Sequence, residues 1–128
     1  MLIGNDDSFF GLPANLEEAV ETFIAYYQNE HSFLELAYAP ELIFLNRLHC
    51  GAGLFIRNTW YLEWKEGHSN ASPPASMPPL VRYFNEIGIV HADDMSTIVI
   101  SAVWHKLNDK PFDILYTVKI IQDYWKSQ

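Results

Sequence analysis

The stretch HADDMSTIVISAVWHKLNDK, residues 91–110, carries the clearest helix pattern in this 128-residue chain. Asp93 and Asp94 fall in its first turn, where acidic side chains complement the positive end of a helix dipole, and Lys106 and Lys110 suit the negative end. Between these ends, apolar side chains recur at helical spacing: Ile98, Val99, Ala102, Val103 and Leu107. The stretch therefore predicts a helix with one buried face.

Two capping patterns near the start of the chain predict further helices. Asn15 and Glu18 have the spacing of a capping pair, in which each side chain accepts a backbone N–H of the first turn. Ser32 and Glu35 repeat this spacing and predict a short second helix that ends before Pro40, because the residue before a proline disfavours helical torsions. The apolar stripe of the first helix consists of Leu16, Val20, Phe23, Ile24 and Tyr27.

The segment 41–64 is densely apolar and its periodicity is ambiguous. Gly51 and Gly53 interrupt it, and glycine either breaks a helix or lets a neighbouring element approach closely. We favour close packing within or between helical segments. A short strand at 54–60 is the alternative.

The last third of the chain holds two more candidate helices. The segment 80–87 predicts a short helix that stops at Gly88. In the segment 112–125, helical spacing competes with a strand-like alternation over 112–120, and we favour a helix. Its helical stripe consists of Leu115, Val118, Ile121 (or Gln122) and Trp125. The whole chain therefore predicts an all-α fold, a compact single domain with about five to six helices.

Composition sets the class of protein. Apolar residues make up 49% of the chain and aromatic residues 15%, which is enough to fill the core of one domain over residues 1–128. The single Cys50 excludes an internal disulfide and a multi-cysteine zinc site. Neither a signal-peptide pattern nor an apolar run of about 20 residues is present, so we expect a cytoplasmic protein without a membrane span. A Pro/Ser-rich loop is expected at 66–79.

The net charge of −8 comes entirely from the first 46 residues, which contain no Lys or Arg. The remaining residues hold eight acids and eight bases and are neutral. Such a split favours a basic protein partner and disfavours nucleic acid and anionic membranes. The acids of the first part are Asp6, Asp7, Glu17, Glu18, Glu21, Glu30, Glu35 and Glu41.

Two blocks of the sequence resemble an uncharacterised bacterial domain family of unknown function. Residues 48–60, LHCGAGLFIRNTW, resemble its signature "LHFGLGxxIRNxW", with Cys50 in place of an aromatic residue. Residues 88–99, GIVHADDMSTIV, resemble "GIxHPDDMSxII", with Ala92 in place of proline, and residues 16–20 are similar to its "LxEAV" helix start. The resemblance implies a bacterial origin and a shared fold, and no chemistry.

The polar residues of the two blocks have two interpretations. Arg57 with Asp93 and Asp94 is typical either of an ion pair that joins two helices or of an anion-binding or acid–base site, and we favour the structural interpretation. His49 and His91 lack the spacing of a metal site, so no metal and no cofactor is expected. The alternative pocket would consist of His49, Arg57, Asn58, His91, Asp93 and Asp94.

These observations favour a non-enzymatic, acidic protein-binding domain. A concrete version is an immunity-type or antitoxin-type inhibitor that captures a basic bacterial toxin. The alternatives are a small enzyme or ligand-binding domain that uses the polar pocket, and a homodimer built from the aromatic helices. The expected partner-binding face consists of Glu17, Glu18, Glu21, Glu30, Glu35 and Glu41.

Overall fold

A computed structural model describes residues 12–65 and 76–128, and neither of these ranges contains a strand. The all-α prediction is therefore confirmed, and the runs α4, η1 and α5 follow one another without a break. In chain order the elements are α2 (Leu16–Tyr27), α3 (His31–Leu36), α4 (Glu41–Leu48), the π-helical turn η1 (His49–Gly53), α5 (Leu54–Thr59), α6 (Pro79–Glu86), α7 (Ala92–Leu107) and α8 (Ile114–Lys126).

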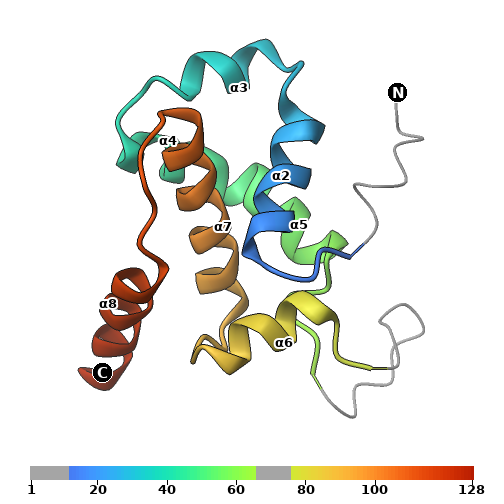
Figure 1. Cartoon of the computed structure of the whole chain (residues 1–128), viewed down its shortest axis with the longest axis vertical. Helices are drawn as coiled ribbons and strands as arrows, with labels where there is room; N and C mark the ends of the chain where they lie inside the picture. Colours follow the sequence, from blue (N-terminus) through green and yellow to red (C-terminus); the bar gives the residue numbers. More distant parts are fainter. Residues whose placement is uncertain (1–11, 66–75) are drawn as a thin grey trace.

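Helix α7 runs through the centre of the molecule (Figure 1). Helices α2, α4 and α5 and the turn η1 all contact it, so it is buried on more than one side. The prediction of a single buried face was too narrow, because Met95, Ser96 and Ile100 are buried as well as the predicted stripe. Leu107 at its end is only partly buried.

One predicted cap is confirmed and the other is wrong. The Asn15 side chain accepts the Glu18 N–H at 2.9 Å, and the Glu18 carboxylate accepts the Ala14 N–H at 2.9 Å. Helix α3 instead begins two residues earlier than predicted, at His31, after Glu30, whose side chain makes no capping hydrogen bond. Ser32 therefore lies inside the helix, where its hydroxyl cannot serve the free N–H groups of the first turn.

The segment 54–60, the first possible strand, is helical. Gly53 fulfils the prediction of close packing, since an added Cβ would lie 3.2 Å from both Arg57 Nη1 and the Leu48 carbonyl oxygen. Gly51 does not, because nothing lies within 4 Å of an added Cβ there. The five-residue turn η1 carries both glycines and connects α4 to α5 without a loop.

Helix α6 ends as predicted. Its last residue is Glu86, and Gly88 follows with a φ of +94°, a conformation that residues with a Cβ rarely adopt. The Gly88 carbonyl accepts a hydrogen bond from the Gln122 side chain at 3.4 Å, which links this turn to α8.

The second possible strand, 112–120, is helical from Ile114 onwards. The Asp113 side chain caps α8 by accepting the Tyr116 N–H at 3.0 Å. The predicted stripe was wrong at Leu115, which is 72% exposed, whereas Val118 is buried. Helix α8 lies at the edge of the molecule and packs on one side only (Figure 1), so most of its surface faces outward.

The expected Pro/Ser-rich loop lies largely outside the described residues, as do Asp6 and Asp7. In the two described ranges, no helix is both long and apolar enough to cross a bilayer.

Candidate functional site

The guanidinium of Arg57 is the centre of the polar cluster predicted from the two sequence blocks. Arg57 is only 7% exposed, and its Nη1 donates to Ser96 Oγ at 2.8 Å. Its Nε lies 3.4 Å from Asp93 Oδ1, and the Ser96 hydroxyl donates to the Asp93 carbonyl at 3.0 Å. Because a buried charge is costly unless it is paired and hydrogen-bonded, these contacts make Arg57 a link between α5 and the first turn of α7.

The neighbouring aspartate, Asp94, contacts a different residue. The carboxylate of Asp94 accepts the indole N–H of Trp125, with 2.8 Å between Oδ2 and Nε1. The Trp125 ring also stacks on His91, with 4.1 Å between the ring centroids. His91, Asp94 and Trp125 line a hollow of about 320 Å³ between the start of α7 and the end of α8, and Arg57 does not line it.

The remaining members of the predicted pocket lie apart from this hollow. His49 is exposed on the turn η1, and Asn58 is exposed on α5. His91 occupies the N-cap position of α7, without a capping hydrogen bond from its side chain. Among the described residues, no cluster of three or more His, Cys, Asp or Glu side chains has the arrangement of a metal site.

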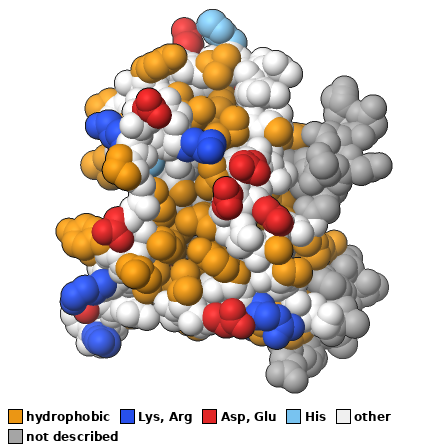
Figure 2. Space-filling model, in the orientation of Figure 1, with side chains coloured by type: hydrophobic (Ala, Val, Ile, Leu, Met, Phe, Trp, Pro, Cys, Tyr) orange, Lys and Arg blue, Asp and Glu red, His pale blue; other side chains and the backbone are white. Residues whose placement is uncertain are grey.

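Three members of the predicted acidic face lie on α2. Glu17, Glu18 and Glu21 are exposed, and none of them forms an ion pair within the described part of the chain. Glu17 and Glu21 lie four residues apart and so share one side of the helix. Figure 2 shows acidic side chains gathered over α2, next to a hollowed hydrophobic area.

The other three acids are spread along the next two helices. Glu30 and Glu35 line a second hollow, of about 640 Å³, together with Arg47 and Tyr27. Burial raises the pKa of the Tyr27 phenol to about 12, with smaller contributions from Tyr26 and Glu30. Glu41 is partly buried, and its carboxylate accepts a hydrogen bond from the Ser101 hydroxyl. The six acids therefore do not form one continuous face.

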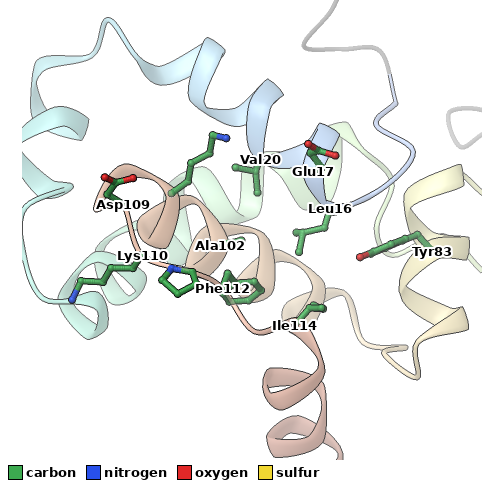
Figure 3. A pocket seen from close by; sticks show the side chains of 11 residues that line it. Leu16, Glu17, Val20, Tyr83, Ala102, Asp109, Lys110, Phe112 and Ile114 are labelled. Atoms are coloured by element: carbon green, nitrogen blue, oxygen red, sulfur yellow. The ribbon is translucent and has the colours of Figure 1, made fainter.

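The hydrophobic area beside Glu17 is a groove of about 590 Å³, which we call the α2–α7 groove (Figure 3). Leu16 and Val20 enter it from α2, and Phe112 and Ile114 enter it from the segment before and at the start of α8. Charged groups border this apolar floor. The full lining consists of Leu16, Glu17, Val20, Tyr83, Ala102, Lys106, Asp109, Lys110, Pro111, Phe112 and Ile114.

The α2–α7 groove was not predicted from the sequence. Tyr83 projects into it from α6, and burial raises the pKa of the Tyr83 phenol. The only signal in the sequence was the stripe of α2, and that stripe predicts core packing equally well. Lys106 and Lys110 were assigned to the end of a helix, which says nothing about the hollow that they border.

Comparison with known proteins identifies a domain family. Residues 12–107 match the model of a domain of unknown function, DUF6794. No curated protein and no solved structure matches the chain. The matched range includes both sequence blocks, the Arg57 link and α2, whereas α8 lies beyond it. The match confirms the resemblance to an uncharacterised domain family: the chain belongs to the DUF6794 family.

Proposed function

We propose that this domain is a non-enzymatic binding module that captures a basic protein partner through α2. The observation that carries this proposal is the position of Glu17 and Glu21, two exposed carboxylates of α2 that form no ion pair within the described residues. Glu17 lines the α2–α7 groove, and Glu21 lies one helical turn further along α2. Unpaired charges of one sign project a field into solvent, and this field accelerates the encounter with an oppositely charged protein.

The α2–α7 groove offers the partner an apolar surface, which charged side chains alone do not provide. Electrostatic contacts at the rim of an interface mainly set the association rate, whereas apolar side chains buried in a pocket carry most of the affinity. An apolar floor bordered by charged groups therefore suits a partner that inserts an apolar or aromatic side chain between basic residues. Lys106 and Lys110 also line the groove, and they would repel the basic residues of the partner.

A concrete form of this function is an immunity-type or antitoxin-type inhibitor that acts in the bacterial cytoplasm. Its small size, its net charge of −8 and its resemblance to a bacterial family support this form. The inhibitor would cover the basic surface of a toxin and so block access to the toxin's substrate. The first step is therefore to express the neighbouring gene and to measure binding to its purified product.

The decisive measurement compares two variants with equal changes in charge. In E17K/E21K two exposed acids of α2 become basic, one of which lines the groove, and in the control E63K/E86K two exposed acids that do not line the groove become basic. We expect E17K/E21K to reduce the association rate with the partner about tenfold or more at low salt, and to flatten the salt dependence. Glu18 is left unchanged because it accepts the Ala14 N–H. Equal rates for the two variants would contradict the proposal.

The alternative function, a small enzyme or ligand-binding domain, has less support. It requires Arg57 and Asp94 to converge on one solvent-accessible cavity. Arg57 is instead buried against Ser96, and Asp94 contacts Trp125 at a hollow that Arg57 does not line. Binding of a small anion to the protein, lost in R57M and also in D94N, would restore this alternative.

A further inference from the structure

The hollow of about 640 Å³ between α3 and α4, which we call the α3–α4 hollow, is lined by charges of both signs. Glu30 lines it from the N-cap position of α3, Glu35 from α3 itself, and Arg47 from α4. All three residues are exposed. Within the described residues, Glu30 and Arg47 form no ion pair, and Glu35 pairs only with His31. Opposite charges therefore line one hollow without pairing with each other.

Most of the remaining lining of the α3–α4 hollow is apolar. Leu36 and Leu48 are partly buried, and Ile43 is 44% exposed, so the hollow offers apolar surface that a ligand can cover. Phe33 and Ala52 also line it and are buried. Sites for small molecules combine such a lining with a few polar groups, in volumes of about 300–1,000 Å³. The α3–α4 hollow has both properties.

Part of the α3–α4 hollow is shielded from water. Tyr27 lines it from α2, and the burial that raises the pKa of its phenol shows that solvation is weak there. The charge of Glu30 contributes to the same pKa shift, so this carboxylate lies near the shielded phenol. Charges interact more strongly where water is partly excluded. A cationic group beside Glu30 is therefore held more firmly than it would be on an open surface.

We propose that the α3–α4 hollow binds a short apolar peptide with both ends free. The ammonium group of the peptide contacts the carboxylates of Glu30 and Glu35. Its carboxylate accepts hydrogen bonds from the Arg47 guanidinium, whose planar fork fits a carboxylate with two parallel N–H···O bonds. Its apolar side chains cover the exposed part of Ile43. A ligand with a single charge would leave either the acids or the arginine without a partner, whereas a zwitterion satisfies both.

The separation of the charges favours a dipeptide over a single amino acid. Because neither Glu30 nor Glu35 pairs with Arg47, a ligand that contacts both signs has to bridge the gap between α3 and α4. The charged ends of a free amino acid lie only about 3 Å apart, whereas those of an extended dipeptide lie about 6 Å apart. Exposed charges contribute little individually, so we expect a Kd of about 0.1–1 mM.

Titration of the full chain with the dipeptide leucylphenylalanine, followed by the amide signals in ¹H–¹⁵N NMR spectra, tests the proposal. We expect the shifts to be concentrated in α3, α4 and η1. Blocking either end of the dipeptide, by N-acetylation or by C-terminal amidation, should weaken binding about fivefold or more. No protein partner takes part, and none of the three charged residues lines the α2–α7 groove, so the outcome does not depend on the function proposed above.

Two variants assign the ends of the dipeptide to the two sides of the hollow. In R47M, the free dipeptide and its C-terminal amide should bind equally well, because the partner of the carboxylate is lost. In E30Q/E35Q, the free dipeptide and its N-acetyl form should bind equally well, because the partners of the ammonium group are lost. Each variant should therefore remove the preference for one free end and keep the preference for the other.

The matched controls are R82M and E17Q/E21Q, which remove exposed charges that do not line the α3–α4 hollow. Both should keep the preference for two free ends. Absence of shifts up to about 10 mM dipeptide would overturn the proposal. Equal binding of the free and blocked forms would also overturn it, because the hollow would then recognise apolar surface alone. Tighter binding of a longer peptide blocked at both ends would replace it with a docking site for a protein segment.

Discussion

The indole N–H of Trp125 donates a hydrogen bond to the carboxylate of Asp94, with 2.8 Å between Nε1 and Oδ2. Asp94 lies within the range that matches the family, and Trp125 lies beyond it. This bond therefore fastens the C-terminal helix to the first turn of the central helix of the family domain. The stack of Trp125 on His91 supports the same contact.

Loss of this bond is expected to loosen α8 without unfolding the domain. In W125F the ring stays apolar and its hydrogen bond to Asp94 is lost, which weakens the docking of α8 by about 0.5–1.5 kcal/mol. Hydrogen exchange of the α8 amides should accelerate, while exchange of the α7 amides stays unchanged. Equal acceleration in both helices would show that the bond supports the whole fold.

The Arg57 side chain should contribute more to the free energy of unfolding than its ion pair with Asp93 contributes alone. We expect R57M to lower the free energy of unfolding by about 2–4 kcal/mol, because it removes the bond to the buried Ser96 hydroxyl. D93N should cost less than about 1 kcal/mol, since Asp93 is 71% exposed and water replaces the pair. Urea unfolding followed by circular dichroism measures both. A larger loss for D93N than for R57M would contradict this assignment.

The two glycines of the π-helical turn should respond to alanine in opposite directions. G53A places a methyl group 3.2 Å from the Leu48 carbonyl oxygen and from Arg57 Nη1, and we expect a loss of about 1–3 kcal/mol. G51A meets nothing within 4 Å, and it should gain up to about 1 kcal/mol because alanine favours a helix. Thermal unfolding of the two variants provides the comparison, and a stabilising G53A would refute the packing argument.

Tyr27 should make the protein sensitive to alkaline pH. Its pKa is about 12 in the folded chain and 10.0 without the fold, so the unfolded chain loses this proton first. The contribution of Tyr27 to stability is therefore complete below pH 10 and is lost as the pH rises towards 12. Y27F should show a smaller fall in the free energy of unfolding across this range. If the free energy of unfolding falls equally with pH in Y27F and in the unchanged protein, the raised pKa of Tyr27 is contradicted.

Local signals in the sequence predicted the helices, and tertiary contacts decided how their surfaces are used. Asp93 and Asp94 are adjacent and were treated as one acidic pair. The helix turns them towards different neighbours, Arg57 and Trp125. Sequence spacing reports that two residues lie in one turn, and it does not report which element packs on each side.

The sequence patterns missed the exposure of Leu115 and the α2–α7 groove for the same reason. Leu115 fits the helical period of α8, but only one side of that helix meets the core, and Ile114 lies there in its place. The groove combines residues of α2, α6, α7 and the segment before α8. Periodicity within one segment contains no information about such combinations, so the site had to be found in three dimensions.

The turn η1 also sets the angular phase of the helices on either side of it. In an uninterrupted α-helix, Phe44 and Ile56 would point about 120° apart. A π-helical turn accommodates roughly one extra residue, which reduces this angle to about 20°. Both side chains are fully buried, and their helices both contact α7. Deleting one residue from the turn would therefore rotate α5 by about 100° and carry Arg57 away from Ser96.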